Sequence, residues 1–482
     1  LFLGSKKYPD EAYYSKRLSE LGGHSNAYTD TNKTVYYFNV YNSGLEEILD
    51  IFSRFFIDPV FDMNSISREI NAVNNEHLKN INNDYWRGFQ LMLNLTDSTS
   101  PTNTFITGSK ETLDKPDIRD KMIEFYKKYY VSENISICIA SSIDSNTIKN
   151  MINDTFGHIM KKSCEPMKIT KPFFKTNQGN VYHLESISNI YAITYIWEIP
   201  DVTYDSDLMN DFMLLFNIFN DKSEESFYFL LKNMGYITGI SNELRSEGIF
   251  TLTISLTKEG LNNIKLIDNI LFTYLEEIYE LPLEKYATYY KSIEDINFDC
   301  MNKIEAEELC NMLASDHHYV KTINVYNHML INKIHKSSYY SDLYKKYINN
   351  DVIKIIVCKE YTKGKEYVLK HYGAKYSKIP NINSNEVKEK HIISSDTNNP
   401  FLDVNIRLIK KLDKYKKPIL INTRQWYGGS SKYGEPLVFI LMQLTNKKFY
   451  NNPTNFVLSI ICCDILNFLI KVKLNKALEL PY

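Results

Sequence analysis

SISREINAVNNEHLKNINNDYWRGFQ, residues 65–90, is the stretch around which this 482-residue chain is organised. Apolar residues such as Ile66 and Ile70 recur at helical spacing and predict one long amphipathic helix. Glu69 and Glu76 are a whole number of turns apart, so they project from nearly the same side, separated by roughly 10 Å. Both border the apolar stripe. They are either solvated charges or half-buried carboxylates with a chemical role.

The composition is that of a globular protein with room for two or three domains, since 44% of residues are hydrophobic and 24% are charged. A formal net charge of -2 with dispersed lysines argues against nucleic acid or an anionic membrane as partner. The most apolar run, 456–470, contains Asp464 and Asn467 and is shorter than the about 20 residues that a membrane span needs. We therefore expect no membrane span.

The seven cysteines form no CxxC pair, and their odd, scattered count argues against a disulfide framework. Reduced thiols in a cytosol-like compartment are the expectation, although the location itself stays open. Leu1 is not a methionine, and the first residues lack the pattern of a secretory signal. We expect the chain to begin inside a larger protein.

An internal repeat divides the chain. FYKKYYVSENISICIA, 125–140, parallels LYKKYINNDVIKIIVC, 343–358, at an offset of 218. The segments around Gly44 and Gly260 match at an offset of 216. Collinear matches at nearly the same large offset indicate a duplicated domain rather than a solenoid, whose repeats are typically about 20 to 50 residues long.

Local patterns place helices and strands in the same order in both copies, which predicts an α+β fold with a mixed sheet and helices on one face. The first copy lacks the strand-and-helix unit that opens the second, and a third copy starts near the end of the chain, so the chain is expected to be truncated at both ends. The expected elements are a helix closed by Gly22 and Gly23, a strand at 35–40, helices at 45–57 and 65–90, strands at 135–141 and 191–199, a helix at 204–219, a strand at 437–444 and a helix at 453–480.

The residues alone do not supply a complete catalytic motif. The sequence has no HxxEH, the helical motif that gives a zinc hydrolase two ligands and a general base. The nearest imitation is VNNEH, 73–77, in which Val73 replaces the first histidine. GxSxG, the P-loop and GxGxxG are also absent from the sequence.

The stretch LFLGSKKYPDEAYYSKRLSELGGHSNAYTDTNKTVYYF, followed by REINAVNNEHLKNINNDYWRGFQ, resembles the first domain of the insulin-degrading, pitrilysin-type zinc peptidases of the M16, or inverzincin, class. The resemblance is dense over 1–90, thins through the second domain and reaches WYGGSSKYGEP near Trp426. It implies duplicated M16-like sandwich domains. The expected boundaries are a first domain at 1–165, a second at 175–375, a linker at 376–400 and the beginning of a third at 401–482.

The resemblance also assigns a metal site. Glu76 matches the family's zinc-ligand glutamate, and Glu69 matches the supporting carboxylate two turns earlier. The implied cofactor is Zn²⁺. The family's HxxEH sits immediately before the segment that resembles LFLGS, so it would lie upstream of Leu1. The chain as given should therefore be inactive by itself.

Ser25, Asn26, Ala27 and Tyr28 match the edge segment where the family's peptide substrate adds as a strand. A plain surface hairpin is the alternative. The family's glycine-rich loop, which anchors the substrate N-terminus, aligns with 221–226, DKSEES, which has no glycine.

The leading hypothesis is thus a zinc metalloendopeptidase acting on peptides, present as a fragment. The alternative is a non-catalytic member of the family that binds peptides or forms a complex. The resemblance further implies a homodimer.

Overall fold

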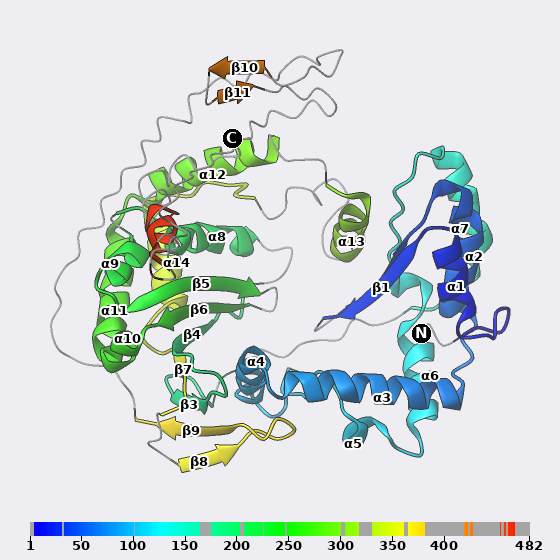
Figure 1. Cartoon of the computed structure of the whole chain (residues 1–482), viewed down its shortest axis with the longest axis horizontal. Helices are drawn as coiled ribbons and strands as arrows, with labels where there is room; N and C mark the ends of the chain where they lie inside the picture. The colour runs from blue at the N-terminus through cyan, green and yellow to red at the C-terminus, as the bar shows by residue number, and fades with distance from the viewer. Residues whose placement is uncertain are drawn as a thin grey trace. The chain divides into compact units, whose positions relative to one another are not determined.

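The structure of the chain is a computed structural model, drawn as a ribbon in Figure 1. By its internal contacts the chain divides into two compact units. Unit 1 comprises Leu1–Ile190, Ile304–His328 and Ile353–Pro380, and unit 2 comprises Tyr191–Lys303, Met329–Val352 and Asn381–Tyr482. The structure describes residues 4–30, 33–100, 102–163, 174, 176–202, 207–224, 226–245, 248–299, 304–317, 330–360, 365–380, 419–422, 425–427, 454, 457–458 and 461–467.

Unit 1 combines a β-hairpin, a set of helices and a mixed sheet. The hairpin strands pair antiparallel, with Ser25 opposite Phe38 and Ala27 opposite Tyr36. Its elements are α1 (Tyr13–Glu20), β1 (His24–Thr29), β2 (Thr34–Asn39), η1 (Asn42–Gly44), α2 (Leu45–Ile57), α3 (Met63–Asn80), α4 (Asp84–Asn94), α5 (Lys110–Leu113), α6 (Ile118–Tyr129), η2 (Ser132–Asn134), α7 (Ser145–Thr155), η3 (Phe156–His158), β3 (Val181–Glu185), α13 (Ala306–Asp316), β7 (Ile353–Cys358), β8 (Lys365–Val368) and β9 (Lys375–Ile379).

The sheet of unit 1 has the strand order β7-β3-β9-β8. β3 pairs parallel with β7 and antiparallel with β9, and β8 pairs antiparallel with β9. Every residue of β7 is buried, Lys354 included. The other residues of its sequence, IKIIVC, are apolar, as is typical of a buried parallel strand. The sheet is mixed, as expected.

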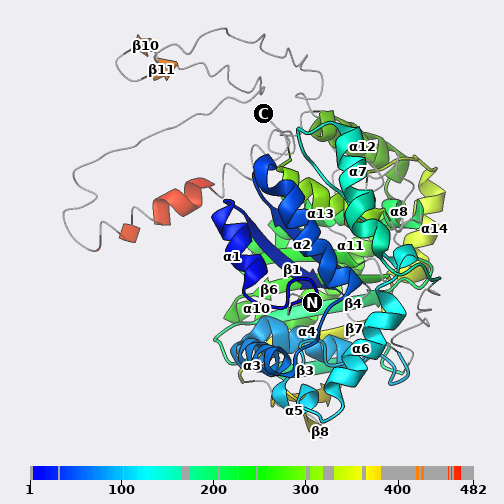
Figure 2. The ribbon, with the colours of Figure 1, turned by 90° about the vertical axis from the view of Figure 1, so that its right-hand side faces the viewer.

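Helices α1 and α2 pack an apolar core against the β1–β2 hairpin, and α7 packs on α2 (Figure 2). α2 buries Ile48, Phe52 and Phe55 at helical spacing, and Phe38 of β2 packs edge-on against Phe52 with ring centroids 4.9 Å apart. Burial of each such side chain contributes about 1.5–3 kcal/mol. α2 has the predicted bounds because its apolar spacing is regular and Pro59 lies just beyond its end.

Unit 2 contains a second β-hairpin with a further antiparallel strand, in the order β5-β6-β4. Helices pack beside these strands, among them α8 and α9 against β5. The elements are β4 (Ala192–Glu198), α8 (Asp207–Asn220), α9 (Phe227–Asn233), β5 (Ile237–Arg245), β6 (Ile249–Leu256), α10 (Lys258–Asn262), α11 (Ile264–Glu280), α12 (Leu283–Asp299), α14 (Ser337–Tyr347), β10 (Ile419–Asn422) and β11 (Gln425–Tyr427).

The two copies share an order of elements, as the internal repeat predicts. Helix, hairpin and helix follow one another as α1, β1, β2 and α2 in unit 1, and as α9, β5, β6 and α10 with α11 in unit 2. The fold class is therefore α+β, with a mixed sheet, helices and repeated domains.

Two expected elements differ in the structure. The helix expected at 65–90 is divided into α3 and α4, because the Asn83 side chain accepts a hydrogen bond from the Tyr85 N–H and starts a new helix. The strand expected at 135–141 has no ladder among the described residues, although Ile135 and Ile139 still pack against the α2 core. Its counterpart β7 is a strand because β3 pairs with it.

The structure describes the C-terminal part of the chain only in short segments. β9 occupies the start of the expected linker, and β10 pairs antiparallel with β11 within the range expected for the third domain. Residues 461–467 are helical, whereas the strand expected at 437–444 lies outside the described residues. Within the described part of the chain, no helix is long and apolar enough to cross a membrane.

Candidate functional site

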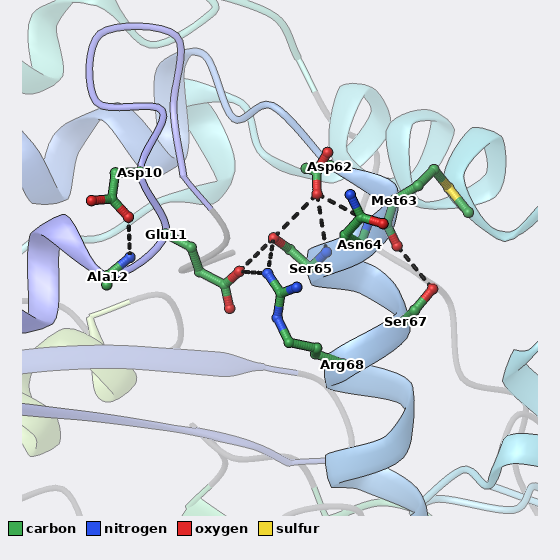
Figure 3. A network of polar contacts seen from close by, with 9 residues as sticks. All are labelled: Asp10, Glu11, Ala12, Asp62, Met63, Asn64, Ser65, Ser67 and Arg68. Carbon is green, nitrogen blue, oxygen red and sulfur yellow. Dashed lines mark hydrogen bonds and ion pairs between the residues drawn. The ribbon is translucent and has the colours of Figure 1, made fainter.

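The start of α3 is fixed by a network of polar contacts (Figure 3). The Asp62 carboxylate caps the helix by accepting from the backbone N–H groups of Asn64 at 3.0 Å and Ser65 at 3.1 Å. Glu11, which precedes α1, accepts from Ser65 Oγ at 2.5 Å and from the Arg68 guanidinium. These hydrogen bonds, from Ser65 first and Arg68 second, hold the pKa of Glu11 below its ordinary value.

One face of α3 is apolar and determines which residues are exposed. Ile66 and Ile70 are buried together with Phe61, and side chains of α6 pack against them. A helix held on one face presents the remaining residues to solvent. The rotation of α3 about its axis is therefore set by its isoleucines.

Glu69 and Glu76 both lie on the exposed side of α3. Neither carboxylate makes a hydrogen bond or ion pair with another described residue. They are exposed rather than half-buried, because the buried stripe continues from Ile70 toward His77 and leaves both glutamates outside it. Their carboxylate oxygens therefore accept no hydrogen bond from the described residues.

His77 is the residue at this site that the sequence analysis did not single out. It is only 4% exposed, and its Nε2 donates to the carbonyl oxygen of His371 at 3.0 Å. Its ring packs edge-on against Phe105 and Tyr372, with centroids 4.9 and 5.2 Å away. The signal was its spacing of seven residues from Ile70, which places it on the apolar face.

The segment 25–28 forms most of β1, and β1–β2 is a two-stranded sheet in the described part of the chain. The Ala27 N–H donates to the Asn26 side chain at 2.9 Å instead of to a strand. At the start of β1, His24 Nε2 lies 2.9 Å from Glu307 of α13, and Asn39 donates to the same carboxylate at 2.8 Å. One end of the hairpin is thus anchored to α13.

Some polar side chains of the glycine-free loop at 221–226 bond within the loop and to the start of α9. Asp221 accepts from the Ser223 N–H and from Ser223 Oγ, each at 2.8 Å. Ser226 caps α9 by accepting from the Phe229 N–H at 3.1 Å. These donors and acceptors are therefore engaged within the loop and helix start.

Among the described residues, Glu76 offers one donor to a metal ion. A carboxylate oxygen is a donor that zinc accepts, and Glu76 is exposed and otherwise unengaged, so it fits as one ligand. No group of three or more His, Cys, Asp or Glu side chains in the described ranges is placed to hold a metal ion. Glu76 would therefore need ligands from outside these residues.

Two protein-family models match the chain. The model described as Insulinase (Peptidase family M16) matches residues 1–99, and the model described as Peptidase M16 inactive domain matches residues 117–288. Together they cover more than half of the sequence and include α3, β1 and the loop at 221–226.

Similar proteins include the A-factor-processing enzyme of Saccharomyces cerevisiae, 30% identical over 312 residues, and the insulin-degrading enzyme of Drosophila melanogaster, 26% identical over 509 residues. These alignments cover 62% and 99% of this chain, but the chain spans only 30% and 50% of those relatives. The crystal structure of pitrilysin has a similar fold, with a TM-score of 0.73 and 21% identity, covering 88% of this chain and 47% of that one.

Proposed function

This chain belongs to the insulinase family, peptidase family M16, and we propose that it is part of a zinc metalloendopeptidase that cleaves peptides. The observation that carries the proposal is the state of Glu76. It lies on a helix fixed at its start by Glu11 and along its length by Ile66 and Ile70, yet its own carboxylate is exposed. A carboxylate held by a rigid helix and left unengaged suits a metal ligand.

In the intact protein, Glu76 would be one zinc ligand, and two others would come from an upstream HxxEH. When bound, zinc in such a site polarises the scissile carbonyl and lowers the pKa of its water. Glu69, two turns before Glu76, would act as a supporting carboxylate that orients a neighbouring ligand. α3 would thus contribute two carboxylates from one exposed face.

The substrate peptide would add to β1 as a further strand. Main-chain hydrogen bonds then give affinity that depends little on side-chain identity. Ser25, Asn26, Ala27 and Tyr28 would form this edge, and Tyr28, with 43% of its surface exposed, offers an aromatic contact. The Ala27 N–H becomes available to a peptide when the Asn26 side chain turns away from it.

A second candidate function is a non-catalytic member of the family that binds peptides or forms a complex. The loop at 221–226 favours it. The side chains of Asp221 and Ser226 accept hydrogen bonds from nearby residues, and the loop has no glycine that would let a ligand approach its backbone closely.

Homodimer formation would be tested by sedimentation of the full-length protein.

The test is to express the full-length protein and measure its zinc content and its cleavage of an unstructured peptide. About one zinc per chain with chelator-sensitive cleavage supports the peptidase. Zinc without cleavage supports the second function, and absence of zinc from the full-length protein overturns the metal assignment.

A Glu76→Gln variant tests the ligand directly, because a neutral amide is a poor zinc ligand. We expect its zinc affinity to fall by more than the about 10- to 100-fold typical of outer-shell changes. Glu124→Gln on the exposed side of α6 is the matched control and should bind zinc as the wild type does. Unchanged zinc occupancy in Glu76→Gln would refute the role of Glu76.

A further inference from the structure

His77 and Glu76 are neighbours in the last part of α3 but face opposite environments. Glu76 is exposed, whereas the His77 ring is buried between Phe105 and Tyr372. α3 ends at Asn80, so both residues lie within the final turn and a half. Terminal helical turns fray unless tertiary contacts hold them.

The hydrogen bond of His77 has a defined direction. A carbonyl oxygen can only accept, so the proton of the 3.0 Å contact to His371 resides on His77 Nε2. Nδ1 of the same ring is buried and has no hydrogen-bond partner. The ring is therefore held by a single directional bond and by the two aromatic edges.

The acceptor is presented by an unusual backbone. His371, in the turn between β8 and β9, has φ of +70°, a conformation that residues other than glycine rarely adopt. Its ring stacks on Phe105 with centroids 4.3 Å apart and planes inclined by 13°. This stacking holds the turn in the conformation whose carbonyl meets His77.

We propose that His77 is a positioning residue for Glu76: it fastens the last turns of α3 to the β8–β9 turn, so that the Glu76 carboxylate is held in one place. The inference rests on the proposed zinc site. Metal–ligand distances tolerate only about ±0.2 Å, so fraying at Glu76 would weaken the site even though His77 does not touch the metal.

The experiment compares three variants in the full-length protein. His77→Phe keeps a ring but removes the donor, and His77→Gln restores a side-chain N–H that can reach the same carbonyl. The matched control is His183→Phe in β3, because His183 is also buried and contacts the Cys358 carbonyl at 3.0 Å through Nε2. Loss of the His183 hydrogen bond should lower the stability of the fold without removing a contact of α3.

Three readouts separate positioning from general destabilisation. They are the zinc dissociation constant, the visible spectrum of the cobalt-substituted protein, and backbone hydrogen exchange of residues 76–80 without metal. For His77→Phe we expect about tenfold weaker zinc binding, a changed cobalt spectrum and faster exchange at 76–80. His77→Gln should recover most of each effect, and His183→Phe should show none of them.

The outcomes distinguish the inference from the proposed function. If wild-type protein binds zinc and His77→Phe binds it equally well with an unchanged cobalt spectrum, the positioning role is overturned and the zinc site stands. If wild-type protein binds no zinc, the zinc site and the role of His77 toward it both fall. If His77→Phe and His183→Phe change zinc binding, the cobalt spectrum and hydrogen exchange equally, His77 has only a structural role and the inference is wrong.

Discussion

Gly22 and Gly235 close equivalent helices in the two copies with the same left-handed backbone, φ of +72° and +73°. Each N–H donates at 3.0 Å to the carbonyl three residues earlier, Ser19 in one copy and Lys232 in the other. Their surroundings differ. A Cβ at Gly22 would lie 2.5 Å from the Tyr41 ring, whereas one at Gly235 would meet no atom within 4 Å.

This pair predicts unequal costs for the same substitution. Gly235→Ala should lower the free energy of unfolding by about 1 kcal/mol, because an L side chain is strained at positive φ. Gly22→Ala should cost more, since Tyr41 must also move, and the excess should disappear in a Tyr41→Ala background. Urea unfolding measures both. Gly157→Ala, at a position with open space and no positive φ, is the control. Equal costs would contradict the contact with Tyr41.

The contacts between Glu11 and the start of α3 predict a pH-dependent contribution to stability. The folded-state pKa of Glu11 is lowered, so its contribution is present above the ordinary value of 4.5 and is lost as the pH falls through the folded-state pKa. Because Glu11 and Arg68 are partly exposed, we expect Glu11→Gln to cost only about 0.5–1 kcal/mol at pH 7.

The measurement is the urea midpoint of wild-type and Glu11→Gln protein at pH 7 and at about pH 3, which lie above and below the ordinary carboxyl pKa. The difference between the two proteins should shrink at the lower pH. A difference that stays constant would show that the carboxylate charge does not contribute.

Part of the fold could be predicted because local patterns agree with the final packing. The spacing of Ile48, Phe52 and Phe55 in α2 and the helix-closing Gly22 are satisfied by near neighbours in sequence. The division between α3 and α4 was missed, since apolar periodicity continues across it while one side chain, Asn83, captures a backbone N–H.

Other features depend on residues far apart in sequence. The stretch 135–141 has strand composition, but a strand needs a hydrogen-bonded neighbour, which composition does not supply. His77 was overlooked because a polar residue concealed the apolar period, and its partner His371 is 294 positions away. Helical spacing singles out Glu69 and Glu76, and the family resemblance assigns zinc to Glu76. The structure adds that Glu76 is exposed and unengaged.

The proposed peptide-binding edge at β1 can be tested in the full-length protein. Ala27→Pro removes the N–H that now donates to Asn26, so one main-chain hydrogen bond to a peptide strand would be lost. We expect KM to rise by up to about tenfold with a smaller change in kcat. Steady-state kinetics on one peptide measure this. Asn26→Ala, which keeps the N–H and removes only its side-chain partner, should not raise KM. If KM rises in Asn26→Ala and stays unchanged in Ala27→Pro, the peptide does not bind through the Ala27 N–H.

Cys138 and Cys310 show a second relationship that the sequence does not reveal. Both are free thiols in unit 1, half-buried, and hydrogen-bonded to each other through their side chains. The bond from Cys138, with a backbone contact from Ala140, lowers the pKa of Cys310 to about 7 and raises that of Cys138. Cys310 is thus the better nucleophile near neutral pH.

The prediction concerns the rate at which iodoacetamide labels Cys310. Because the thiolate is the reacting species, the rate should be half-maximal near the pKa of about 7. Cys138→Ala removes the stabilising bond, so the midpoint should move toward the ordinary value of 9.0. Mass spectrometry of the Cys310 peptide across pH measures the profile, and the exposed Cys462 and Cys463 report reagent activity in the same sample. Identical profiles with and without Cys138 would show that the two thiols do not interact.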